Sequence, residues 1–119
     1  VIGDHAGRSL LVRKHGAQVF QQPGGKREPG DADDLATLAR ELREELGCEL
    51  VAGSASLLCR CSAPAANEPG YVVEAVVYVV QVTGTITAQA EIAELHWIDH
   101  AAPDVPVAQL SRENILPLL

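Results

Sequence analysis

The chain has 119 residues, a length typical of one domain with a single hydrophobic core. Hydrophobic residues make up 47% of it, but it holds only one Trp, two Tyr and one Phe, so the core must consist mainly of Val, Leu, Ala and Ile. The formal net charge of −7 argues against binding to a nucleic acid polymer, which requires a basic face. An anionic small-molecule substrate is still compatible with this charge, because bound cations can reverse the local field.

The three cysteines, Cys48, Cys59 and Cys61, lack the spacing of a zinc site or a disulfide framework, which favours reduced side chains in a cytoplasmic protein. Cys59 and Cys61 alternate in a strand-like segment, so both side chains are expected on one side of it. No signal peptide is visible, and the longest apolar run, residues 75–80, is too short to span a bilayer, so we expect no membrane partner. Because the sequence has no Met and opens on Val1, native residues are expected to precede it.

The first part of the chain predicts three short strands and one helix. The strands lie at residues 1–2, 9–13 and 19–21, and Pro23 ends the third because proline cannot donate to a strand ladder. The helix begins near residue 31 or 33, where aspartates favour an N-terminus, and ends at Gly47, which fits a left-handed cap. Its core face consists of apolar residues at helical spacing, namely Leu35, Leu38, Ala39, Leu42 and Leu46.

The second part predicts three further strands and a terminal helix. In order, these are a strand at 50–61 with an irregularity at 53–54, a loop at 62–70, a long and largely buried strand at 71–82, a strand at 95–98 with Trp97 in the core, and a short helix at 110–119 interrupted at Pro117. The order β-β-β-α-β-β-β-α predicts one α/β domain over residues 1–119, with helices packed on a mixed sheet.

The predicted helix carries a group of glutamates with a specific spacing. Glu44 and Glu45 follow Glu41 by three and four residues, so the carboxylates share one side of adjacent turns. Their repulsion, a few tenths of a kcal/mol per pair, disappears when a divalent cation lies between them, and Mg²⁺ or Mn²⁺ suits such oxygen ligands. A solvated helix face balanced by Arg40 and Arg43 is the alternative interpretation.

The stretch from Pro23 to Cys48, PGGKREPGDADDLATLARELREELGC, resembles the Nudix box. In that signature a glycine is followed after five residues by Glu, and after seven more by R-E-aliphatic-x-E-E-x-G-aliphatic. Gly25 matches the first glycine, and residues 40–48 match the closing run. Residues 10–13 and 91–98 resemble the segments that flank the box. Two departures stand out: Asp31 replaces the Glu, and eight residues rather than seven separate it from Arg40. We expect the extra residue to be absorbed in the loop or the first helical turn, which leaves the role of Asp31 open.

The resemblance implies an α/β/α sandwich and a hydrolase that cuts a pyrophosphate bond in a nucleoside diphosphate linked to another moiety, using Mg²⁺ or Mn²⁺. The implied metal ligands are Glu41, Glu44, Glu45 and the carbonyl of Gly24. Arg40 would orient the glutamates through charge-assisted hydrogen bonds. The proton would be taken by one of these glutamates or by one of the later loop, with Glu91 the first candidate and Glu94 the second. Gly25 and Lys26 are the implied substrate-binding residues.

The substrate is less constrained. The short chain and the PGGK run favour a MutT-like nucleoside triphosphate pyrophosphohydrolase, with oxidised purine nucleotides as one option. Pro64, sixteen residues past the box, instead favours ADP-ribose or nucleotide-sugar cleavage. Tyr71 or Phe20 could stack on a base, and Asn114 could bind a base edge. A non-catalytic nucleotide-binding domain is the remaining alternative, although such domains usually lose the R-E or E-E residues, and Arg40, Glu41, Glu44 and Glu45 are all present here. Dimers are common in the family, so a homodimer is compatible with the resemblance.

Overall fold

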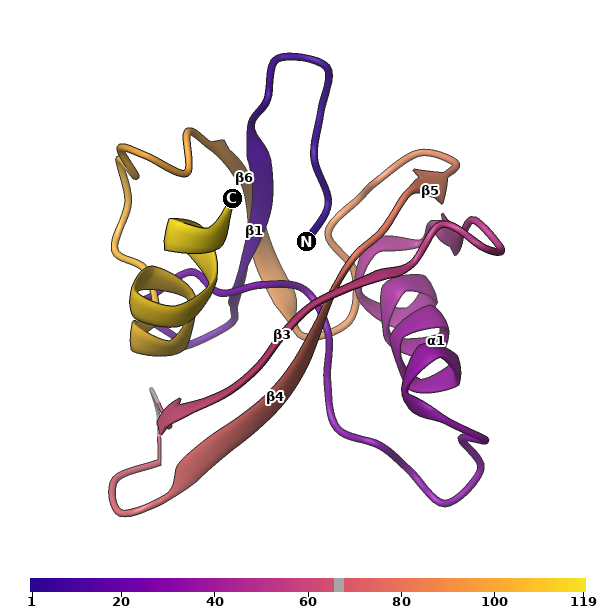
Figure 1. The fold of residues 1–119 in the computed structure, drawn as a ribbon, viewed down its shortest axis with the longest axis horizontal. Coiled ribbons are helices and arrows are strands. Elements are labelled where there is room, and N and C mark those ends of the chain that lie inside the picture. The colour runs from indigo at the N-terminus through magenta and orange to yellow at the C-terminus, as the bar shows by residue number, and fades with distance from the viewer. Residues whose placement is uncertain (66–67) are drawn as a thin grey trace.

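The computed structural model describes residues 1–65 and 68–119 (Figure 1). Its elements are β1 (Ser9–Lys14), α1 (Asp34–Leu46), β2 (Glu49–Leu50), β3 (Ser56–Pro64), β4 (Val72–Val79), β5 (Val82–Thr83), β6 (Ile92–Ile98), the π-helical η1 (Ser111–Ile115) and the 3₁₀-helical η2 (Leu116–Leu118). The strands pair antiparallel as β1–β6, β2–β5 and β3–β4. Single parallel bridges, Ile2 to Val80 and Phe20 to Val107, give the mixed character that was predicted.

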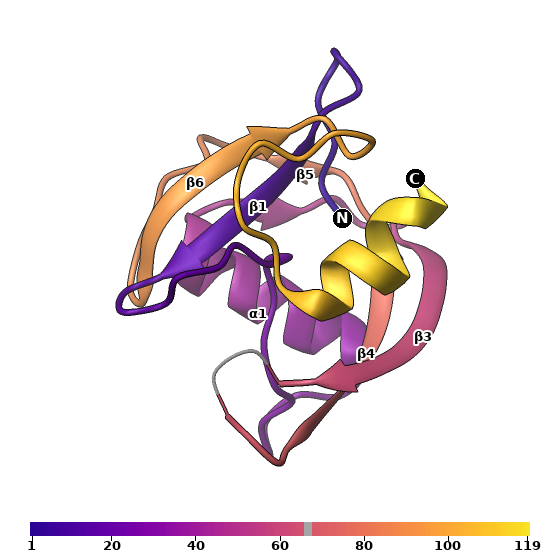
Figure 2. The same ribbon diagram turned by 90° about the vertical axis from the view of Figure 1, so that its left-hand side faces the viewer.

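Strand β1 lies between α1 and the C-terminal helices in Figure 1, and Figure 2, which looks along this direction, shows the C-terminal helices in front and α1 behind. Because successive side chains of a strand point to opposite faces, Leu10 and Val12 pack in the core that contains Leu42 of α1. Leu11, on the opposite face, packs in a second core with Leu116 of η2. The α/β/α sandwich therefore follows from a strand that is apolar on both faces.

Helix α1 is limited by the caps that the sequence predicts. The side chain of Asp33 accepts a hydrogen bond from the backbone N–H of Ala36 at 2.8 Å, which makes Asp33 the N-cap. Gly47 adopts a left-handed conformation with φ of 67°, and its N–H donates to the carbonyl of Arg43. The helix is regular from Asp34 to Leu46, so the place predicted for the extra residue lies in the loop before Asp34. One part of the predicted core face is wrong, since Leu35 in the first turn is exposed.

Two predicted strands are wrong in extent. The strand predicted at 50–61 is divided into β2 and β3 at the irregularity that was predicted at 53–54, which is a turn in which Gly53 has φ of 77°. The long strand predicted at 71–82 is divided into β4 and β5, and much of β4 is exposed, with Val72 at 65%. In both cases the two halves pair with different partners, β2 with β5 and β3 with β4. A strand with a single neighbouring strand has less cover, so β-branched composition overstates its burial.

Smaller differences concern the ends of elements. Residues 1–2 and 19–21 form only isolated bridges, and β6 begins at Ile92, earlier than predicted. The loop predicted at 62–70 is shorter, because β3 continues to Pro64; residues 66 and 67 of that prediction lie outside the described residues. Trp97 is half-buried at the edge of the first core. In the described part of the chain, no helix has the length and apolar character needed to cross a membrane.

Candidate active site

Three carboxylates from distant parts of the chain converge on one point. Glu41 and Glu45 lie one turn apart on α1, and both are buried, with 8% and 1% exposed. Glu91 lies just before β6 and is exposed. One carboxylate oxygen of each residue lies within 4.8 Å of the other two. We refer to these three residues as the glutamate cluster. The fold thus brings Glu91 beside α1. Spacing along the sequence could not predict this proximity, because Glu91 lies on a different element.

The carboxylate of Glu45 is the most perturbed group of the cluster. Burial raises its pKa to about 7, and the nearby charges of Glu41 and Glu91 act in the same direction. A hydrogen bond from the N–H of Gly24 to Oε1, at 3.0 Å, and the charge of Lys14 act against that rise. The other oxygen, Oε2, is buried and has no hydrogen-bond partner in the part of the chain that the structure describes.

These residues fit a divalent cation. Mg²⁺ and Mn²⁺ prefer oxygen ligands, and every potential ligand in the cluster is a carboxylate oxygen. A buried acceptor without a partner costs free energy, so Oε2 of Glu45 is a place where a cation would be favourable. Gly24, predicted to offer its carbonyl, contacts Glu45 through its amide.

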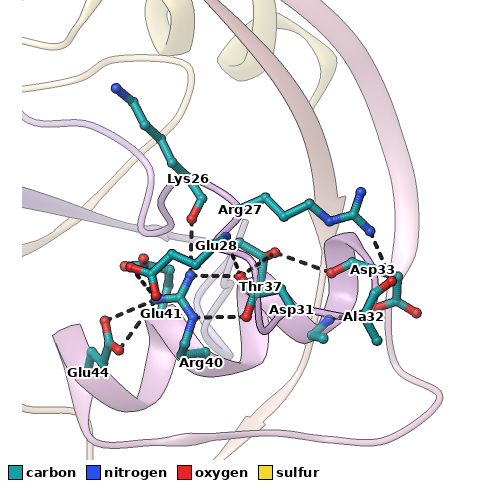
Figure 3. Close-up of polar contacts among 11 residues, drawn as sticks. Lys26, Arg27, Glu28, Asp31, Ala32, Asp33, Thr37, Arg40, Glu41 and Glu44 are labelled. Atoms are coloured by element: carbon teal, nitrogen blue, oxygen red, sulfur yellow. Dashed lines mark hydrogen bonds and ion pairs between the residues drawn. The ribbon is translucent and has the colours of Figure 1, made fainter.

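Gly25 lies directly against Glu41. A Cβ built on Gly25 would lie 2.7 Å from Oε2 of Glu41, and closer still to Oε1 and Cδ. No side chain fits there unless the carboxylate moves. The Gly-Gly loop therefore permits its backbone to approach the cluster, which is a packing role that the sequence did not indicate. Lys26, the next residue, is exposed, and its side chain extends away from Arg40 (Figure 3).

Arg40 connects the loop to the helix (Figure 3). Its Nε and Nη2 donate to Oδ1 and Oδ2 of Asp31 at 3.0 and 2.9 Å, and Nη2 also donates to the carbonyl of Lys26 at 3.0 Å. Its Nη1 donates to Oε1 of Glu41 at 2.9 Å. The hydrogen bond from Arg40 holds the pKa of the Asp31 carboxyl well below its usual range. Arg40 is therefore placed to orient Glu41, as the resemblance implies.

Glu44 lies outside the glutamate cluster. Its carboxylate is exposed and accepts hydrogen bonds from Nη1 of Arg40 at 3.3 and 3.4 Å (Figure 3). Because an α-helix has 3.6 residues per turn, neighbouring side chains point in different directions. Glu45 therefore points into the protein, whereas Glu44 points outward. The structure thus brings two of the three predicted helical ligands together with Glu91, and the metal-binding role of Glu44 stays a prediction.

The backbone before β6 holds Glu91 in position. The N–H of Gln89 donates to the carbonyl of Glu45 at 2.9 Å, and the N–H of Ile92 donates to the carbonyl of Gln89 at 3.0 Å. Between them, Ala90 has φ of 52°, the only positive φ of a non-glycine residue in the described part of the chain. This conformation disfavours a side chain by roughly 1 kcal/mol. The turn therefore holds Glu91 beside the helix at the expense of local strain.

Lys14 is a site residue that sequence reasoning missed. Its Nζ lies 3.6 Å from Oε1 of Glu91. The register between β1 and β6 shifts between Arg13 and Lys14, so Lys14 pairs with Ile92 at the end of the strand. An irregularity of this kind redirects a side chain. The alternation of the sequence offered no signal for it, because the shift depends on the partner strand.

The remaining candidates have other surroundings. Glu94 forms an ion pair with Arg13 at 3.0 Å. Phe20, a candidate for stacking on a base, is buried in the second core. Tyr71 is exposed, Asn114 lies in η1, and Pro64 is the last residue of β3.

Comparison with known proteins places this geometry in a family. A family model described as NUDIX domain matches residues 1–119. The solution structure of the E. coli ORF135 protein is 27% identical and aligns over 99% of this chain and 82% of that chain, with a TM-score of 0.77. The crystal structure of the MutT NUDIX hydrolase from Burkholderia pseudomallei is 25% identical over 99% of this chain and 95% of that chain, with a TM-score of 0.81. An ADP-ribose pyrophosphatase from Streptococcus suis shares the fold, at 19% identity over 98% and 82% of the two chains and a TM-score of 0.69.

The fold and these matches define the class of the protein, which is a pyrophosphohydrolase acting on acid anhydrides. The chain belongs to the Nudix family, and its predicted Nudix-type fold is confirmed. Members of this family generally use divalent metals and act on small nucleotide substrates.

Proposed function

We propose that this chain hydrolyses a pyrophosphate bond in a nucleoside diphosphate linked to another moiety, with Mg²⁺ or Mn²⁺ bound at the glutamate cluster. The observation that carries the proposal is the convergence of Glu41, Glu45 and Glu91, in which Oε2 of Glu45 is buried without a partner among the described residues. A solvated helix face would leave its carboxylates in water, whereas Glu41 and Glu45, the two members of the cluster that lie on α1, are both buried. That burial favours a metal site over the alternative interpretation of the box.

The residues around the cluster have separate tasks in this proposal. When bound, the cation neutralises phosphate charge and makes the attacking water more acidic. The N–H of Gly24 fixes the orientation of Glu45, and Arg40 fixes that of Glu41. Glu91, exposed at the edge of the cluster, is proposed to accept the proton of the water. Glu44 is proposed as a further ligand on the exposed side.

A nucleoside triphosphate is the substrate that the observations favour, and an oxidised purine nucleotide is one candidate. The PGGK run and the similarity to a MutT NUDIX hydrolase over 95% of that chain support this choice. Lys26, exposed in the loop that approaches the cluster, is proposed to contact the phosphates, with Gly25 bringing the loop close to them. Pro64 at the end of β3 supports ADP-ribose or a nucleotide sugar as the second candidate.

The test is a Mg²⁺-dependent phosphate-release assay over nucleoside triphosphates, ADP-ribose, dinucleoside polyphosphates and nucleotide sugars. We expect hydrolysis of at least one class, and a loss of at least about 100-fold in kcat for Glu45→Gln. Glu49→Gln is the matched control, because Glu49 is exposed and pairs only with Arg43 in the described residues, so its activity should be unchanged. Activity that survives the double change Glu44→Gln and Glu45→Gln would overturn the mechanism. Tight nucleotide binding without hydrolysis of any class would instead support a binding domain.

A further inference from the structure

Cys59 and Cys61 form a close thiol pair outside the glutamate cluster. Their Sγ atoms are 3.6 Å apart, and both residues lie half-buried on β3. They pair with Val77 and Ala75 of β4. Cys48, the third cysteine, is fully buried in the first core. Nothing in the proposed hydrolysis uses the pair.

The distance between the two sulfurs is shorter than the strand itself imposes. Residues i and i+2 share one face of a strand but are separated by about 6.6 Å along it, at a rise of about 3.3 Å per residue. Side chains that merely stood upright would keep their sulfurs about that far apart. In β3 the two side chains lean toward each other, next to a register shift between Leu57 and Cys59 that changes the local twist. Burial and the neighbouring thiol raise the pKa of Cys61, which favours the protonated form of that side chain.

The spacing suits two bonds to one soft centre. Two sulfurs bonded to one centre at about 2.3 Å each can lie at most about 4.6 Å apart. The observed separation of 3.6 Å is therefore within the reach of one shared centre. A structural zinc site needs four such ligands. The only group of three or more His, Cys, Asp or Glu ligands among residues 1–65 and 68–119 is the glutamate cluster, so no third protein ligand of these types joins the thiols there. Thiolate pairs without further ligands favour soft centres of low coordination number.

We propose that Cys59 and Cys61 are a dithiol site that chelates one soft, thiophilic centre, of the class of Cu⁺ or trivalent arsenic. With an arsenic(III) oxide, two As–S bonds form, and the two thiol protons leave with the arsenic-bound oxygen as water. With Cu⁺, two Cu–S bonds form and both protons pass to solvent. Neither reaction changes an oxidation state, so no oxidant or reductant is required.

Phenylarsine oxide added to the reduced full chain tests the site. Intact-protein mass should show one arsenical per chain, and native titration with a thiol reagent should show the loss of two reactive thiols. The adduct should resist an excess of a monothiol and be removed by a dithiol, since a chelate must lose two bonds at once. Cys59→Ser and Cys61→Ser should each lose the monothiol-resistant adduct, whereas Cys48→Ser should keep it.

A second titration distinguishes the possible occupants. Cu⁺ competed against a colorimetric chelator should bind once per chain and depend on the same two cysteines if the site takes soft ions in general. Retention of the arsenical alone restricts the site to trivalent arsenic. The proposal is overturned if the wild-type chain forms no monothiol-resistant adduct, or if Cys59→Ser forms it equally well. Hydrolytic activity plays no part in either readout, so the outcome is independent of the proposed function.

Discussion

The carboxylate of Asp31 and the guanidinium of Arg40 form a two-point ion pair, with N–O distances of 3.0 and 2.9 Å. Asp31 also accepts hydrogen bonds from the N–H of Glu28 at 2.8 Å and from the hydroxyl of Thr37 at 3.0 Å. The resemblance to the Nudix box left this residue in doubt, because it is shorter than the expected Glu and displaced by one position. In the structure it joins the loop to α1, and through Arg40 to Glu41. The insertion has therefore left the connection intact.

Asp31→Asn should lower the affinity of the site for Mn²⁺ without abolishing binding. An amide cannot accept both hydrogen bonds from Arg40 with the same charge assistance, so Arg40 and Glu41 lose their fixed orientation. Changes to residues that orient metal ligands typically cost about 10- to 100-fold in metal affinity or activity, and we expect Mn²⁺ affinity to fall in this range. Asp34→Asn is the control, because Asp34 lies in the first turn of α1 and takes no part in this network among the described contacts. Equal Mn²⁺ affinities of the two variants would contradict the role of Asp31.

Gly25→Ala should displace the carboxylate of Glu41. The new Cβ would lie 2.7 Å or less from both oxygens of Glu41, a separation that real Cβ atoms do not tolerate. We expect Mn²⁺ affinity to fall by about 10- to 100-fold while the protein stays folded, because the moving group is the end of a side chain. Gly30→Ala makes the same change in the same loop, where a Cβ meets nothing within 4 Å. Calorimetric titration of both variants checks the difference, and a Gly25→Ala protein that binds Mn²⁺ like Gly30→Ala would exclude the clash.

Substitutions of Ala90 by Gly and by Val should change the backbone strain at this position. Glycine adopts a φ of 52° without strain, so the free energy of unfolding should stay level or rise by up to about 1 kcal/mol. Ala90→Val should lower it by roughly 1 to 3 kcal/mol and weaken Mn²⁺ binding, because a β-branched residue disfavours this conformation and displaces Glu91. Ala88→Val, at an exposed position of the same segment without positive φ, is the control for added bulk. Chemical denaturation and Mn²⁺ titration measure both effects. An Ala90→Val protein as stable as the Ala88→Val protein would show that the turn is unstrained.

The stability of the metal-free protein should fall as Glu45 ionises. Its pKa is about 7 in the folded state and 4.5 when unperturbed, so between these values the folded state binds more protons than the unfolded state. The associated stability is present below pH 4.5 and is lost as the pH rises through 7, on the order of 2 kcal/mol. Glu45→Gln lacks this loss. The stability of the wild type relative to the variant, measured by denaturation in chelator, should therefore fall with rising pH across that window and stay level outside it.

The affinity for Mg²⁺ should change with pH in the opposite direction to the stability of the metal-free protein. Because a ligating carboxylate must be deprotonated, Mg²⁺ affinity should rise as the pH passes through about 7 in the wild-type protein. A flat affinity between pH 6 and 8 would contradict the assignment of Glu45 as a ligand.

The sequence predicted the parts of the fold that depend on local interactions. Periodicity and capping residues located α1, whose N-cap Asp33 and C-cap Gly47 act within one turn of their own positions. The phase of Arg40, Glu41 and Glu45 on that helix followed directly. The division of the strands was predicted only in part. The sequence indicated an irregularity at 53–54 but a single strand across it, and it indicated no break within 71–82. β2 with β5 and β3 with β4 are pairings between distant segments, and composition does not specify them.

The candidate site shows the same division. Glu41 and Glu45 were predicted from spacing, and Glu91 from the resemblance. The burial that separates Glu45 from the exposed Glu44 depends on the sheet against which α1 packs, so the helix alone could not distinguish them. Lys14 was missed because a register shift against β6 sets its direction. The close approach of Gly25 to Glu41 likewise arises from tertiary packing.

The segment before β6 is bonded to the end of α1 through backbone groups. The N–H of Thr87 donates to the carbonyl of Leu46, and the N–H of Gln89 donates to that of Glu45, both at 2.9 Å. We therefore expect the last carbonyls of the helix and the segment before Glu91 to open and close together, as one cooperative unit. Glu45 and Glu91 would both hold a bound cation, so cation binding would favour the closed form of this unit. Cation binding should therefore slow hydrogen exchange at the amides of Thr87 and Gln89, even in the absence of a phosphate substrate.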